Sequence, residues 1–281
     1  MSQVPISSGA RLLGAACAGA LLAGAALLGP ASAASPKNAE VDVELVLAVD
    51  VSYSMDLDEQ VLQRDGYAGA VTSKEFLDAL KLGLTGRIAI AYVEWAGQDD
   101  QQLVVDWHII DGPASAQAFA DAVRAAPQRR VYRTSISSAL LYSADQFDLN
   151  KFDGLRRVID VSGDGVNNQG PPVAVARDAV VLRGITINGL PLLLKSATSQ
   201  AMDVPELDYY YEDCVIGGPG AFVIPIQHKS EFARAIKTKL VLEVAGVKLP
   251  DTPNPVIPVA KSEPRVSCTI GEKIWLENWS N

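Results

Sequence analysis

A short polar segment follows the first apolar stretch of the chain and carries side chains that could bind a hard metal ion. It reads D-V-S-Y-S over residues 50–54, directly after the run VELVLAV over residues 43–49. A continuous apolar run of this length predicts a strand buried on both faces, as in a parallel sheet. Because ligands of open α/β sheets bind just beyond the carboxyl ends of strands, we expect Asp50, Ser52 and Ser54 at a binding site.

Two further segments place oxygen atoms at comparable junctions. Thr134 precedes a helix predicted over residues 135–147, and Asp164 follows a strand predicted over residues 157–161. Carboxylates and hydroxyls, with no His or Cys nearby in sequence, favour Mg²⁺ as the ion, with Mn²⁺ or Ca²⁺ as alternatives. We therefore predict a metal site with the ligands Asp50, Ser52, Ser54, Thr134 and Asp164.

Helix capping is the alternative role for part of this set. Asp and Ser often cap helices, so Asp50 and Ser54 could serve only the helix predicted over residues 56–67. That role does not account for Thr134 and Asp164.

Taken in order, the three segments resemble the metal-ion-dependent adhesion site of von Willebrand factor A (vWA) domains. The matching residues are D-x-S-x-S at 50–54, T-x-I-x-x-A-L at 134–140, and Asp164-Gly165. The resemblance covers roughly residues 41–245, and the surrounding sequence resembles an uncharacterised family of secreted bacterial proteins with this domain. The chain departs from the pattern at Ser162-Gly163, where vWA domains more often have apolar residues and a Thr.

The resemblance implies a role for each ligand. The hydroxyls of Ser52, Ser54 and Thr134 would bind the ion, and the carboxylates of Asp50 and Asp164 would balance its charge directly or through water. One coordination position would stay open for a carboxylate of the partner.

Strands and helices that could position these residues alternate along the chain. Strands are predicted over 43–49, 87–95, 103–110, 157–161, 185–190 and 221–225, and helices over 56–67, 114–125, 135–147, 172–182 and 232–240. A turn at Asp99-Asp100 makes an antiparallel hairpin of the second and third strands. Thr72 and Glu75 predict a capping box before a further helical piece. The pattern predicts an α/β, doubly wound fold: a mostly parallel sheet with one antiparallel edge strand and helices on both faces.

The two ends of the chain differ from the middle. Residues 1–33 read as a signal peptide cut near Ala33, because a lone Arg11 precedes an uncharged run over 12–28 and then Ala-Ser-Ala. A permanent membrane anchor is the alternative, although a spanning helix needs about 20 apolar residues. A polar leader (34–40), the vWA-like domain (41–246), and a proline-rich linker with a C-terminal tail (247–281) follow. We predict a secreted or periplasmic protein without stable membrane insertion after cleavage.

Two cysteines of the chain could form a disulfide. Cys214 and Cys268 are the only cysteines after residue 33, and in an oxidising compartment such a pair tends to form a disulfide. The bond would attach the tail to the domain, and two unrelated thiols are the alternative.

The net charge of the chain bears on its partners. Residues 1–33 hold one basic residue and no acidic one, so the remaining chain has 33 acidic and 23 basic side chains. Its net charge is therefore −10. This charge disfavours nucleic acid as a partner, because phosphates require Lys and Arg.

These observations favour a binding module without catalytic residues. In it a divalent cation would bridge to an acidic group on another protein or on a cell-surface component. A metal-dependent phosphoester hydrolase is one alternative, but Ser52 stands where aspartyl phosphatases have a second Asp. A structural or assembly protein with a vestigial site is another. His108 and His228 lie far apart and accompany no nucleophile motif, which argues against a catalytic triad.

Overall fold

The computed structural model describes residues 38–194, 204–245 and 263–279. The predicted signal peptide and most of the predicted proline-rich linker lie outside these residues. The described part contains a five-stranded sheet in the order β3-β2-β1-β4-β5, in which only the β2–β3 pair is antiparallel. The strands are β1 (Ala39–Asp50), β2 (Ile88–Trp95), β3 (Gln101–Ile110), β4 (Phe152–Gly163) and β5 (Ile185–Pro191). The predicted parallel sheet with one antiparallel edge strand is confirmed.

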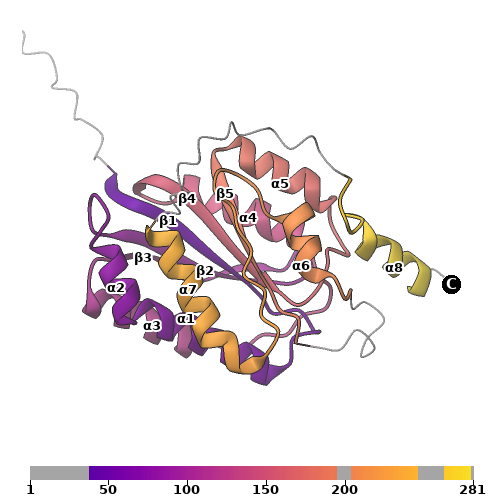
Figure 1. Ribbon diagram of the computed structural model, residues 1–281, viewed down its shortest axis with the longest axis horizontal. Coiled ribbons are helices and arrows are strands. Elements are labelled where there is room, and N and C mark those ends of the chain that lie inside the picture. Colours follow the sequence, from indigo (N-terminus) through magenta and orange to yellow (C-terminus); the bar gives the residue numbers. More distant parts are fainter. Residues whose placement is uncertain (1–37, 195–203, 246–262, 280–281) are drawn as a thin grey trace, which may run out of the picture. The chain divides into compact units, whose positions relative to one another are not determined.

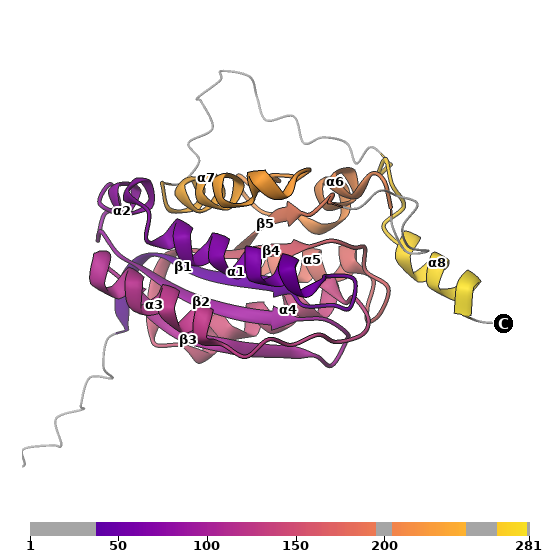
Figure 2. The same ribbon diagram turned by 90° about the horizontal axis from the view of Figure 1, so that it is seen from below.

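Helices cover both faces of the sheet (Figures 1 and 2). One face packs against α1 (Leu57–Val71), α2 (Lys74–Leu80), α3 (Pro113–Ala125) and α7 (Phe232–Ala245). The other packs against α4 (Ile136–Leu149), α5 (Val173–Leu182) and the short α6 (Leu207–Tyr210), which continues into a π-helical turn, Tyr211–Val215.

The central strand β1 shows why its sequence is a continuous apolar run. Successive side chains of a strand point to opposite faces, so a strand covered on both sides needs apolar residues at every position. Leu45 and Leu47 enter the core beneath α1 and α7, whereas Val46 and Ala48 enter the core beneath α4. Asp50 is the last residue of this strand, so the same register brings a carboxylate to its carboxyl end.

A buried ion cluster joins α7 to the sheet. Nζ of Lys239 lies 2.7 Å from Oδ1 of Asp160 in β4 and 2.6 Å from Oε1 of Glu243 one turn further along α7. All three side chains are fully buried. Burial, and after it repulsion from Glu243, raises the pKa of Asp160 to about 7. The ammonium group therefore compensates two carboxylates that have no access to water.

Several local predictions were wrong. Ala39 and Glu40, expected in the polar leader, already belong to β1. Residues 221–225 form no strand, because they meet β5 only through isolated bridges such as Gly189 to Val223. The second helical piece begins after Ser73, which caps it by accepting from the N–H of Phe76.

The C-terminal tail contains a helix, α8 (Ile270–Trp279). Within the described ranges, no helix combines the length and apolar composition needed to cross a membrane.

Candidate functional site

The D-x-S-x-S segment and Asp164 form one hydrogen-bonded group at the carboxyl ends of β1 and β4. The backbone N–H of Ser52 donates to Oδ1 of Asp50 at 2.7 Å. The hydroxyls of Ser52 and Ser54 lie 2.8 Å apart, and that of Ser54 donates to Oδ1 of Asp164 at 2.6 Å. Four of the five predicted ligands are thus brought into contact, although Ser54 and Asp164 are 110 residues apart in sequence.

Thr134 reaches the same end of the sheet by a different route. Its segment runs beside the first loop, where Val131 N–H donates to Val51 O at 3.1 Å. The Thr134 side chain is buried, and a Cβ placed on Gly165 would lie 3.9 Å from its hydroxyl oxygen. The fifth predicted ligand therefore neighbours the loop that carries Asp164.

The electrostatics of this group suit a cation. Asp50 is fully buried, and its Oδ2 has no hydrogen-bond partner among the described residues. Burial, and after it the charge of Asp164, raises the pKa of Asp50 to about 8. Two carboxylates sharing a buried site repel each other unless a proton or a cation lies between them. A divalent ion held by Asp50, Asp164 and the neighbouring hydroxyls would remove both the repulsion and the unsatisfied oxygen.

The donor set differs from that of a site built on carboxylates, imidazoles and thiolates. No group of three or more His, Cys, Asp or Glu side chains is placed to hold a metal ion in the part of the chain that the structure describes. The candidate site has two carboxylates and three hydroxyls, which are the hard oxygen donors preferred by Mg²⁺.

Gly163 leaves the space in which the unsatisfied oxygen lies. A Cβ at this position would lie 2.8 Å from Asp50 Oδ2 and 2.9 Å from the hydroxyl of Tyr211. That hydroxyl is also buried without a partner among the described residues. The departure from the vWA pattern at Ser162-Gly163 thus opens room for Tyr211, a residue that sequence reasoning did not identify.

Two asparagines hold the loop that follows Asp164. Asn168 Oδ1 accepts from the N–H of Thr134 at 3.1 Å. Asn167 is buried; its Oδ1 accepts from Ser137 N–H at 3.0 Å, and its Nδ2 donates to Glu272 of α8 at 2.8 Å. The two side chains tie the loop to the start of α4 and to the tail. No sequence signal could reveal the last contact, whose partners are 105 residues apart.

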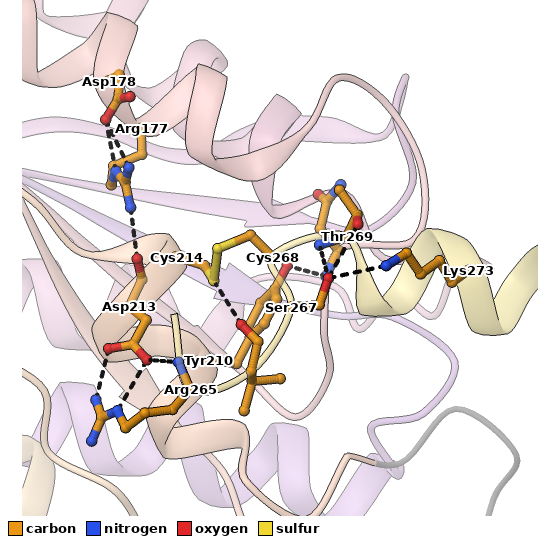
Figure 3. Close-up of a disulfide and its surroundings, with 12 residues drawn as sticks. Arg177, Asp178, Tyr210, Asp213, Cys214, Arg265, Ser267, Cys268, Thr269 and Lys273 are labelled. Atoms are coloured by element: carbon orange, nitrogen blue, oxygen red, sulfur yellow. Dashed lines mark hydrogen bonds and ion pairs between the residues drawn. A yellow bond between two sulfur atoms is a disulfide. The ribbon is translucent and has the colours of Figure 1, made fainter. Parts of the chain in front are cut away.

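A disulfide fixes the tail to the domain (Figure 3). Cys214 and Cys268 are bonded, with their Cα atoms 5.4 Å apart, so the structure contains the predicted bond. Arg265 adds an ion pair to Asp213 at 2.8 Å. Further along, the guanidinium of Arg133 lies 3.1 Å from the centre of the Trp275 ring. Because Arg133 directly precedes Thr134, the tail lies beside the candidate site.

The sequence matches the family DUF1194, described as proteins of unknown function, over residues 40–248. The chain belongs to this family. DUF1194 is a vWA-like family, and the fold described above is the vWA fold. A search of curated proteins found no match. The tail from residue 263, which reaches the candidate site, lies outside the part that matches DUF1194.

Solved structures with this fold share little sequence with the DUF1194 chain. The pilus adhesin SpaC from Lactobacillus rhamnosus GG is 12% identical with a TM-score of 0.53 over 74% of this chain and 31% of its own. Proximal thread matrix protein 1 from the mussel byssus is 14% identical, with a TM-score of 0.52 over 74% and 49%. A von Willebrand factor type A protein from Catenulispora acidiphila is 15% identical, with a TM-score of 0.51 over 74% and 43%. The chain spans less than half of each, and these identities show the fold alone.

Proposed function

We propose that this DUF1194 protein is a metal-dependent binding module rather than an enzyme. A divalent cation at the carboxyl end of β1 would hold an acidic group of another protein or of a cell-surface component. The observation that carries the proposal is the hydrogen-bonded group of Asp50, Ser52, Ser54 and Asp164, in which a buried Asp50 oxygen has no partner among the described residues.

The ion is best matched by Mg²⁺. Asp50, Ser52, Ser54, Thr134 and Asp164 would hold it, directly or through water. When bound, the ion supplies a Lewis-acidic position for an incoming carboxylate. The chain itself supplies a rigid frame, because the first loop is fixed to β1 and Thr134 is fixed through Asn168.

The fold relatives support binding in preference to catalysis. SpaC is a pilus adhesin and the mussel protein is a thread matrix protein, so this fold serves adhesion and assembly outside cells. A hydrolase would need a general acid, and Ser52 stands where a second carboxylate is expected. Export through the signal peptide predicted over residues 1–33 would place the module in the periplasm or outside the cell, among such partners.

Thermal unfolding of the purified protein tests the metal site. We expect the melting temperature to rise when Mg²⁺ or Mn²⁺ replaces EDTA, because a ligand that binds only the folded state stabilises it by mass action. At a hundredfold excess over Kd the gain is about 2.7 kcal/mol. For a domain of this size, that corresponds to a rise of roughly 5–11 °C.

Two variants make the result specific. Asp50→Asn should lose the rise, since it removes the buried charge at nearly constant shape. Asp178→Asn, in which an exposed carboxylate on α5 is neutralised, should keep it. Absence of a rise in the wild type at millimolar metal would contradict the proposal. Release of phosphate from p-nitrophenyl phosphate that Asp50→Asn abolishes would instead favour the hydrolase.

A further inference from the structure

Two exposed tyrosines stand at the edge of the candidate metal site. Tyr53 lies between Ser52 and Ser54 and is 47% exposed, and Tyr132, two residues before Thr134, is 69% exposed. Their rings are stacked, with centroids 4.5 Å apart and planes 14° from parallel. Large aromatic side chains are ordinarily buried for their apolar area. An ordered, exposed pair beside a ligand site is the arrangement that interfaces use, because Tyr offers wide contact at little entropic cost.

Arg130 holds this pair in place. Its guanidinium lies 4.0 Å from the centre of the Tyr53 ring. Nε donates to Met55 O at 2.9 Å and Nη2 donates to Tyr53 O at 2.6 Å. The arginine therefore fastens the D-x-S-x-S loop and contributes to the ordered position of Tyr53.

Arg133 is held in an unusual conformation. Its φ is +79°, the only positive φ at a non-glycine position in the described ranges. Residues with a Cβ rarely adopt this region, and such positions cluster at ligand clamps. The Trp275 ring covers the guanidinium from the tail side. Backbone and ring together fix the direction of this charge next to Thr134.

The two arginines bring positive charge to the edge of the site. No carboxylate among the described residues pairs with Arg130 or Arg133, whereas Arg124, Arg183 and Arg265 each pair with acids. The whole chain carries a net charge of −9. A positive rim on an acidic protein selects acidic partners, because complementary charge steers association and fixes register.

We propose that Tyr53, Tyr132, Arg133 and Trp275 form a recognition rim for an acidic segment of another protein. The proposal rests on the proposed function: one carboxylate of the segment binds the ion, and a second acidic side chain meets Arg133. Tyr, Trp and Arg are the residue types that contribute most to protein–protein affinity. Tyr132 stacks on the Tyr53 ring, and the Arg130 guanidinium lies over the same ring. Because these contacts leave little of the Tyr53 ring face for a sugar ring to stack on, they favour a protein partner.

The C-terminal tail contributes Trp275 to the proposed rim. Trp275 lies beyond residue 248, where the match to DUF1194 ends, and the Cys214–Cys268 bond holds it beside the site. The metal ligands come from the DUF1194 domain, and one rim residue comes from a segment attached to it.

Selection from a random library of twelve-residue peptides, in Mg²⁺ and in EDTA, tests the rim. We expect peptides rich in Asp and Glu to be enriched by the wild type only with Mg²⁺. A synthetic copy of the best peptide should bind at least tenfold more weakly to Tyr132→Ala and to Arg133→Asn. Asn is chosen because it tolerates positive φ. The control is Tyr209→Ala on α6, an exposed tyrosine 4.1 Å from the Arg265 guanidinium and therefore of the same kind; it should change affinity less than twofold.

The outcomes separate the two proposals. Rim variants should keep the full rise in melting temperature with Mg²⁺, because their side chains donate nothing to the ion. No rise in the wild type would overturn the metal site itself. If the melting temperature rises normally, three results would overturn the rim alone. These are that no peptide is enriched, that the enriched peptides lack acidic residues, or that both rim variants bind as tightly as the wild type. The protein would favour an acidic polysaccharide if it bound polygalacturonate, in the presence of Mg²⁺, more tightly than any selected peptide. That result would overturn the proposal of a protein partner.

Discussion

Replacing Lys239 by Met tests how far the fold depends on one buried charge. Met has nearly the length and volume of Lys, so little packing is lost. The variant removes the cation that lies 2.7 Å from Asp160 and 2.6 Å from Glu243, all at zero exposure. The two carboxyl groups must then hold one more proton between them than they hold beside Lys239.

The cost of that proton can be worked out from ordinary carboxyl chemistry. An unfolded carboxyl group has a pKa of about 4, so keeping it protonated at pH 7 costs about three pKa units at 1.36 kcal/mol each, or about 4 kcal/mol. This agrees with the roughly 3–5 kcal/mol lost when a buried pair is broken. At pH 5 the same proton costs only about 1.4 kcal/mol. The folded variant binds more protons than its unfolded chain, so the loss must grow as pH rises.

Urea unfolding followed by circular dichroism, at pH 5 and pH 7, measures both values. The double variant Lys239→Met/Glu243→Gln is the control, because it removes one carboxyl group and should recover most of the loss at pH 7. Equal losses at the two pH values, or a double variant no more stable than the single one, would refute the reasoning.

Other changes have expected outcomes of their own. Cys268→Ser should lower the free energy of unfolding by up to about 4 kcal/mol, since the bond spans 54 residues, as denaturant titration would show. Gly163→Ala should abolish the Mg²⁺-induced rise in melting temperature, because its Cβ would lie 2.8 Å from Asp50 Oδ2. Gly69→Ala in α1 should raise stability by about 0.5–1 kcal/mol, as no atom lies within 4 Å of the new Cβ. The pKa of Asp160 is raised to about 7, so the stability contributed by its protonation is complete below about pH 4 and is lost as pH rises through 7. Melting temperatures recorded in EDTA between pH 5 and 8 should therefore fall as pH rises.

The arrangement of the sheet could be predicted because its strands carry their own signals. A strand buried on both faces has to be apolar throughout, as residues 43–49 are, and the turn at Asp99-Asp100 marks the hairpin. Strand ends then meet at one edge, which is why the proximity of Asp50 and Asp164 followed from topology. Their role as metal ligands stays a prediction.

Other features depend on contacts that no local pattern encodes. Residues 221–225 were predicted as a strand because they form an apolar run, but their bridges to β5 are isolated. Pro225 has no N–H to donate to a neighbouring strand, so the run does not form a continuous strand. The position of α8 depends on the disulfide and on the contact between Asn167 and Glu272. The positive φ of Arg133 occurs at a residue type that gives no hint of it.

The direction of β1 decides how the protein can be attached to a surface. The strand runs for 12 residues from Ala39 to Asp50, and at about 3.3 Å per residue its two ends are about 36 Å apart. A support coupled ahead of Ala39 therefore leaves the candidate site facing the solution. An affinity handle placed after α8 would be attached to the helix that carries Trp275, whose ring lies over Arg133, and would therefore load the proposed rim itself. Immobilisation at the amino-terminal side is thus the geometry in which capture experiments on this protein should be made.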